Sequence, residues 1–117
     1  MMIVDDEESL SEVVRSLLQG LSLEIEAFTR ADEALNAALS RGFDLILTDY
    51  TMPEMTGEEM IIQIQKSKPA KMPQVIFMTG SLVAAVTLLP PDSYRMLVKP
   101  FDKKELFEAL KGWVPGL

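Results

Sequence analysis

Several short apolar runs in this 117-residue sequence end on a polar residue that could take part in catalysis or bind a metal ion. These residues are Asp5, Asp6, Asp49, Thr79 and Lys99. Carboxylate oxygens are hard ligands of the kind that Mg²⁺ uses, together with waters and phosphate oxygens. A carboxylate can also attack a phosphoryl group when the charge on that group is stabilised, a task that an ammonium and a hydroxyl suit. If the fold brings these residues together, their types predict Mg²⁺-dependent phosphoryl chemistry.

Other kinds of chemistry are excluded by what the sequence lacks. It has no histidine and no cysteine, so it can form no Ser-His-Asp triad, thiol nucleophile, disulfide bond or His/Cys zinc site. Neither of two common glycine-rich nucleotide-binding motifs occurs. The formal net charge of −7 disfavours direct nucleic-acid binding, and no apolar run is long enough to span a bilayer. We therefore expect a cytoplasmic domain that contacts neither nucleic acid nor membrane.

The elements that must position these residues are short strands that alternate with helices. Apolar runs predict five strands, at residues 2–4, 21–27, 45–48, 75–78 and 95–98. Apolar residues at helical spacing predict helices that end near Gly20, Gly42, Lys66 and Gly112. A fifth helix within residues 81–89 would be short, because Pro90 and Pro91 forbid its continuation. This alternation predicts one α/β domain over residues 1–117, with a doubly wound parallel sheet and helices on both faces.

Side chains at helix starts and faces give finer expectations. Thr29 and Asp32 resemble a capping box at the start of the second helix, and Asp102 is a candidate cap for the last helix. Val13 and Leu39 belong to the apolar periodicity and are expected on the buried helix faces. The eight methionines are interpreted mainly as core residues that fill gaps.

The carboxyl ends of parallel strands meet at one edge of a sheet, so the polar residues at the strand ends should converge there. Simpler explanations exist for single members of the set. Asp5 and Asp6 could cap the first helix, and Thr79 before a glycine could be a turn residue. Lys99 is harder to explain in this way, because an ammonium at the end of an apolar strand needs a partner. The acidic residues of the same edge are the nearest candidates for that partner.

Four stretches together resemble the receiver domain of two-component response regulators, across essentially the whole chain. They are Ile3 to Glu7, Leu47 to Gly57, Phe77 to Gly80 and Val98 to Phe101. The resemblance implies a flavodoxin-like fold with strand order 2-1-3-4-5. It also implies that Asp49 is the phosphoacceptor and that Asp5 and Asp6 hold Mg²⁺, with the backbone carbonyl of Thr51 completing the metal site.

By the same resemblance, Thr79 is the hydroxyl that follows the phosphoryl group and Lys99 is the ion-pairing lysine. The peptide bond after this lysine is cis in many relatives, and Pro100 allows the same here. The implied reaction moves a phosphoryl group from a histidine of a histidine kinase or histidine phosphotransfer domain to Asp49, and slow self-catalysed hydrolysis removes it. Any enzymatic activity of the domain is thus limited to catalysing its own phosphorylation and dephosphorylation. The sequence does not indicate an oligomeric state.

The sequence also departs from the family pattern. Met96 stands where the family usually has the aromatic residue that responds to the threonine, while Tyr94 lies two residues earlier and could precede the strand. The segment between Thr79 and Lys99 is short, so the fourth helix of the family is expected to be short, displaced or absent. The sequence around Asp49 resembles that of receiver domains attached to hybrid histidine kinases. If this domain is of that kind, it is part of a longer protein.

Two alternative functions remain open at this point. A Mg²⁺-dependent phosphohydrolase of the haloacid-dehalogenase type also uses an aspartate at a strand end. That type requires a second aspartate two residues later, where this sequence has Thr51. The other alternative is an interaction module that keeps the receiver fold and signals without phosphorylation.

Overall fold

A five-stranded parallel sheet forms the centre of the molecule in the computed structural model, which describes residues 1–80 and 86–117. The strands are β1 (Met2–Val4), β2 (Glu26–Phe28), β3 (Leu45–Asp49), β4 (Gln74–Thr79) and β5 (Arg95–Val98). Their spatial order is β2-β1-β3-β4-β5, and every neighbouring pair is parallel. The predicted doubly wound sheet and its 2-1-3-4-5 order are therefore confirmed.

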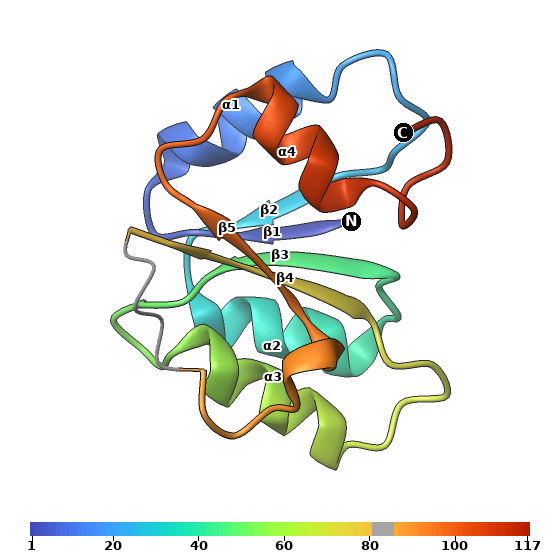
Figure 1. Cartoon of the computed structure of the whole chain (residues 1–117). Helices are drawn as coiled ribbons and strands as arrows, with labels where there is room; N and C mark the ends of the chain where they lie inside the picture. The colour runs from blue at the N-terminus through green and yellow to red at the C-terminus, as the bar shows by residue number, and fades with distance from the viewer. Residues whose placement is uncertain (81–85) are drawn as a thin grey trace.

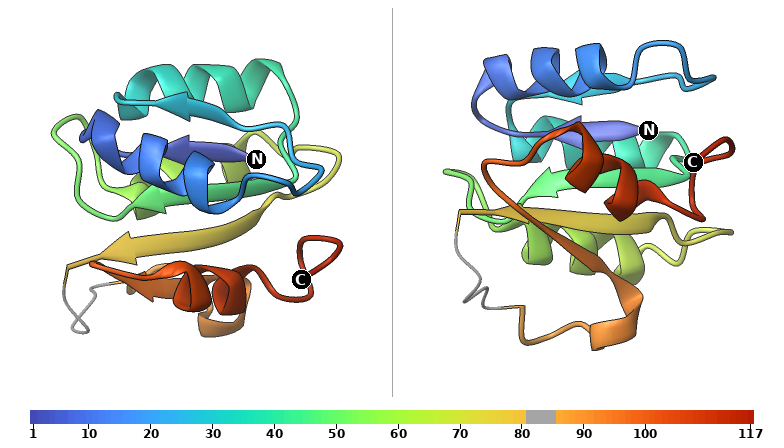
Figure 2. Two further views of the ribbon diagram at one scale, coloured as in Figure 1. Left: turned by 90° about the horizontal axis from the view of Figure 1, so that it is seen from above. Right: turned by 45° about the horizontal axis from the view of Figure 1, so that its top comes forward.

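Helices cover both faces of this sheet (Figure 1). The α-helices of the described residues are α1 (Glu8–Leu17), α2 (Ala31–Ser40), α3 (Gly57–Lys66) and α4 (Lys103–Leu110). A single 3₁₀ turn, η1 (Pro91–Ser93), precedes β5. Helices α1 and α4 lie on one face and α2 and α3 on the other, as the further views in Figure 2 show. None of the helices in residues 1–80 and 86–117 has the length and apolar character needed to cross a membrane.

The core has two layers because successive strand residues point to opposite faces of the sheet. Ile46 and Phe77 pack toward α2 and α3, whereas Leu47 and Ile76 pack toward α1 and α4. All four side chains are fully buried. Strands β3 and β4 are thus covered on both faces, which explains their nearly continuous apolar sequences.

The second strand is shorter than its alternating sequence predicts. Residues 21–27 were expected to be extended, but only Glu26–Phe28 pairs with β1. The backbone N–H of Leu21 donates to Leu18 and that of Leu23 to Leu21, so this part of the chain turns back on the end of α1. Because β1 is only three residues long, it offers no partners for a longer neighbour.

The predicted capping box of the second helix is wrong. Helix α2 begins at Ala31 after Arg30, which provides no side-chain cap. The backbone N–H of Ala31 donates instead to Oε1 of Glu54 at 2.7 Å, and the side chains of Arg30 and Asp32 pair with each other at 3.0 Å. The carboxylate of Glu54, in the loop after β3, therefore caps the start of α2 in place of a neighbouring side chain. The expected cap of the last helix is confirmed, because Asp102 forms a capping box with Glu105.

Two residues of the helical periodicity lie outside the core. Val13 and Leu39 are each 49% exposed, although both were expected to be buried. The strip of each helix that contacts the sheet is narrower than the apolar strip in the sequence.

The short helix predicted within residues 81–89 falls mostly on residues 81–85, which lie outside the described residues. Residues 86–90 are described and are not helical.

Gly57 permits the close packing of α3 against the end of β3. A Cβ atom at this position would lie 2.5 Å from the backbone oxygen of Asp49 and 3.3 Å from the Phe77 ring. We expect Gly57→Ala to lower the free energy of unfolding by about 1–3 kcal/mol, because a backbone atom cannot move aside as a flexible side chain can. Chemical denaturation measures this change. Gly42→Ala is the control, since nothing lies within 4 Å of the added atom there, and an equal loss in both variants would contradict this explanation.

Candidate functional site

The carboxyl ends of the strands lie at the left of Figure 1. The polar residues singled out in the sequence end or directly follow four of these strands. Asp5 and Asp6 follow β1, Asp49 ends β3, Thr79 ends β4 and Lys99 follows β5. The strands are parallel and in register, so their ends come together although the residues are far apart in the sequence. This edge is where open α/β sheets place their ligands.

Lys99 joins two carboxylates of this edge. Its Nζ lies 2.7 Å from Oδ2 of Asp5 and 3.3 Å from Oδ2 of Asp49. The Asp5 side chain is fully buried, and those of Asp49 and Lys99 are 13% and 23% exposed. Lys99 was predicted to have an acidic partner, and it has two, Asp5 and Asp49.

Three carboxylates are close enough to share a metal ion. One oxygen each from Asp5, Asp6 and Asp49 can be chosen so that all three lie within 4.8 Å of one another. Asp6 is exposed, Asp5 is buried and Asp49 is intermediate, so the group opens to solvent on one side. The three carboxylates carry more negative charge than the one ammonium of Lys99 can neutralise. The atoms that they offer to a metal ion are all oxygens. This set fits a hard divalent cation such as Mg²⁺.

Asp5 does not cap the first helix. Its Oδ1 accepts a hydrogen bond from the backbone N–H of Glu7 at 2.8 Å, whereas α1 begins at Glu8 and has no side-chain cap. The other carboxylate oxygen of Asp5 contacts Lys99. The simpler explanation of Asp5 as a helix cap therefore does not hold.

Burial and neighbouring charges shift the proton affinities of the site. Burial is the largest cause that raises the pKa of Asp49, and repulsion from Asp5 adds to it. Lys99 and a hydrogen bond from the backbone of Thr51 partly offset this rise. Burial would lower the pKa of Lys99, but its hydrogen bonds and attraction to Asp5 and Asp49 outweigh burial and raise that pKa. Lys99 therefore remains charged, while Asp49 is charged at a cost that a bound cation would reduce.

The loop between β3 and α3 is fixed close to Asp49. The backbone N–H of Tyr50 donates to Met78 at 2.9 Å, and the carbonyl of Tyr50 accepts from Gly57 at 2.7 Å. The N–H of Thr51 donates to the Asp49 carboxylate. These contacts bring the backbone of Thr51 beside the acidic group, and its carbonyl as a metal ligand stays a prediction.

The end of β4 is tied directly to the lysine. The backbone N–H of Lys99 donates to the carbonyl of Thr79 at 2.7 Å, next to the pairing of Thr79 with Val98. Thr79 is partly buried. The following peptide bond, between Lys99 and Pro100, is cis, as in many receiver relatives. The structure thus places Thr79 and Lys99 side by side, and the role of the Thr79 hydroxyl stays a prediction.

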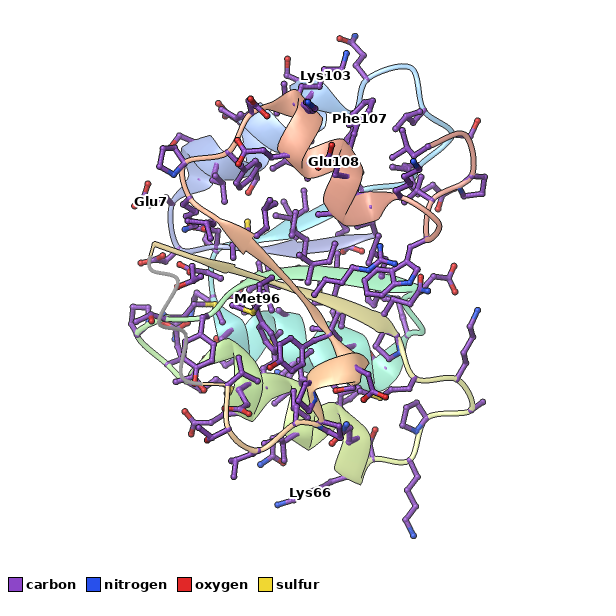
Figure 3. All side chains as sticks on the ribbon, viewed as in Figure 1. Glu7, Lys66, Met96, Lys103, Phe107 and Glu108 are labelled. Carbon is purple, nitrogen blue, oxygen red and sulfur yellow. The ribbon has the colours of Figure 1, made fainter. Side chains whose placement is uncertain are left out.

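Met96, labelled in Figure 3, packs on the side of the sheet that faces α2 and α3, and Tyr94 packs against the same core cluster. Met96 pairs with Phe77 across β4 and β5, and Tyr94 immediately precedes β5. The ring centroid of Phe77 lies 5.4 Å from that of Tyr94 and 5.9 Å from that of Tyr50, in edge-on arrangements. A row of aromatic rings therefore leads from the residue after Asp49 to the start of β5.

Sequence reasoning missed one residue of this region. Glu58, in the first turn of α3, is 3% exposed and accepts a hydrogen bond from the Tyr50 hydroxyl at 3.3 Å. It also accepts hydrogen bonds from backbone N–H groups of residues 87–89. Its burial could have been predicted from its position three residues before the buried Ile61, because residues at that spacing share a helix face.

Comparison with known proteins gives a consistent result. The sequence matches the family described as "Response regulator receiver domain" over residues 1–111. It is 36% identical over 105 residues to the DNA-binding transcriptional regulator NtrC of Klebsiella pneumoniae. That match covers 88% of this chain but only 22% of NtrC.

Solved structures resemble the whole fold. The chemotaxis protein CheY4 of Vibrio cholerae matches with a TM-score of 0.76 and 28% identity, covering 93% of this chain and 92% of that one. The receiver domain of the hybrid histidine kinase CckA matches with a TM-score of 0.75 and 25% identity, covering 94% of each chain.

Proposed function

The chain belongs to the response regulator receiver domain family, whose members signal by phosphorylation in two-component systems, and from this we propose that Asp49 is its phosphoacceptor. In this proposal the domain accepts a phosphoryl group on Asp49 with Mg²⁺ bound and then changes the surface that it offers to a partner. The observation that carries the proposal is the cluster of Asp5, Asp6 and Asp49, in which Asp5 and Asp49 also contact Lys99. No other group of at least three acidic residues in residues 1–80 and 86–117 is close enough to share a metal ion.

Each residue has a defined task in the proposed reaction. An oxygen of Asp49 attacks phosphorus, the P–N bond to the donor histidine breaks, and the imidazole leaves with the bonding electron pair. Lys99, already 3.3 Å from Asp49, neutralises negative charge on the transferring group, and the Thr79 hydroxyl donates a hydrogen bond to it. Asp5, Asp6, Asp49 and the carbonyl of Thr51 would hold Mg²⁺. The ion supplies electrostatic stabilisation of the phosphoryl oxygens when it is bound.

The donor must be another protein or a small phosphorylated compound, because this chain has no histidine. Receiver domains interact with histidine kinases or phosphotransfer proteins, and we propose a partner of this kind. The chain spans about a fifth of the length of NtrC. The proposal therefore concerns the receiver domain and not the activity of a whole protein that contains it. The likeness to the CckA receiver supports, as a further proposal, a place in a hybrid histidine kinase.

A titration with Mg²⁺ and beryllofluoride, which mimics a phosphoryl group on a carboxylate, tests this function. We expect saturable shifts of the backbone amide resonances of Thr79 and Lys99 in an NMR spectrum, and only when both components are present. Mg²⁺ alone should shift the resonances of Asp5, Asp6 and Asp49. Folded protein that responds to neither addition would contradict the proposal. Tight binding of a partner without Mg²⁺ and without Asp49 would favour the interaction module instead.

A further inference from the structure

The carboxylate of Glu58 is buried without a cation. The side chain lies in the first turn of α3 and is 3% exposed. Among the residues that the structure describes, none of the ion pairs involves it. Removing a charged group from water is costly unless other polar groups replace the water. The start of a helix reduces this cost only in part.

Consecutive backbone amides from a distant segment replace that water. The N–H groups of Thr87, Leu88 and Leu89 donate to Oε2 of Glu58 at 3.1, 2.7 and 3.2 Å. The N–H of Thr87 also lies 3.4 Å from Oε1. Successive amides that converge in this way form a concave site for an anion. The carboxylate therefore fixes a piece of backbone that is not helical and leads to η1.

The same carboxylate contacts the residue that follows the phosphoacceptor. The Tyr50 hydroxyl donates to Oε1 of Glu58 at 3.3 Å. Glu58 thus bridges Tyr50 and residues 87–89. Within that segment Leu89 is buried, at 6% exposed, and Leu88 projects outward, at 71% exposed.

We propose that Glu58 is a positioning residue that holds the backbone of residues 87–89 and links it through Tyr50 to Asp49. A change at Asp49 then alters the backbone conformation of this segment. The linkage rests on the proposed function, whereas the anchoring of the backbone does not.

Amide hydrogen exchange in the free protein tests the anchor. In Glu58→Gln, the amides of residues 87–89 should exchange about tenfold faster or more, because an amide oxygen accepts these hydrogen bonds more weakly than a carboxylate does. Glu59→Gln is the matched control, since Glu59 belongs to the capping box of α3 with Thr56 and should leave those amides unchanged. Equal exchange in wild type and Glu58→Gln would overturn the anchor.

Addition of Mg²⁺ and beryllofluoride tests the link. In wild type, amide resonances should shift both at Asp49 and at residues 87–89. In Glu58→Gln the shift at Asp49 should persist while the shifts at residues 87–89 fall by at least half. Tyr50→Phe, which keeps the carboxylate and removes the hydroxyl, should give the same loss if Glu58→Gln does not fold.

The outcomes separate this inference from the function on which it rests. Undiminished shifts at residues 87–89 in both variants would overturn the link and leave the phosphoacceptor role intact. A wild type that shows no shift at Asp49 would overturn the phosphoacceptor role and the link together. The exchange experiment still decides whether Glu58 anchors the segment, because it needs neither metal nor phosphoryl analogue.

Discussion

The Asp49→Asn variant is expected to accept no phosphoryl group from acetyl phosphate or from a phosphohistidine donor. An amide nitrogen and oxygen cannot replace the carboxylate nucleophile, and the neighbouring Asp5 is held by Lys99 and by the backbone of Glu7. Transfer of labelled phosphate to the chain measures this loss. Asp44→Asn serves as the control, because Asp44 is 92% exposed and lies before β3, away from the acidic edge. Wild-type labelling of Asp49→Asn would contradict the assignment.

The same variant should fold at least as stably as wild type when no metal is present. Burial raises the pKa of Asp49 above its ordinary value, so the folded state binds this proton more tightly than the unfolded state does. The charged carboxylate therefore opposes folding at neutral pH, and this cost decreases as the pH falls. A neutral asparagine removes the cost. A thermal melt without metal should show a Tm no lower than wild type, and added Mg²⁺ should raise the Tm of wild type more than that of the variant.

Lys99→Met is expected to slow phosphoryl transfer to Asp49 by about 10²–10³-fold, the usual cost of losing one group that stabilises transition-state charge. The ammonium lies 2.7 Å from Asp5 and 3.3 Å from Asp49 and stays charged because both carboxylates raise its pKa. Its loss also leaves Asp5 buried with one hydrogen bond fewer. We expect the free energy of unfolding without metal to fall by about 2–3 kcal/mol.

Magnesium separates these two effects of Lys99→Met. The variant keeps all three carboxylates, so Mg²⁺ should bind and recover part of the stability while phosphoryl transfer stays slow. Lys71→Met is the control, because Lys71 is 80% exposed and its nearest acidic partner is the exposed Asp44 at 4.0 Å. Transfer in Lys99→Met at the wild-type rate would contradict the role of the ammonium, even if stability falls as expected.

The strand ends were the most predictable part of the molecule. Short buried strands such as β3 and β4 have nearly continuous apolar sequences, so the polar residue that ends each one can be recognised directly. In a parallel sheet those ends must share an edge, so the sequence alone predicts that Asp49 and Lys99 lie close together. The specific roles of these residues came from resemblance to the family.

Contacts between distant segments were not predictable from local patterns. Thr29 and Asp32 have the spacing of a capping box, but Glu54 reaches α2 from another loop and takes over the capping. The neighbouring sequence contains no sign of the role of Glu58, because the backbone groups that it binds lie 29 to 31 residues later in the chain. In both cases the hydrogen bond is tertiary, so the local sequence pattern does not reveal it.

Peptide mapping of the phosphorylated domain tests the central claim most directly. The protein is incubated with acetyl phosphate, with and without Mg²⁺, and the adduct is located by tandem mass spectrometry after rapid trapping. Our account predicts a single phosphoryl group on Asp49 that forms only with Mg²⁺ present. A folded protein that carries the group on another residue, carries it equally without Mg²⁺, or carries none would contradict the account.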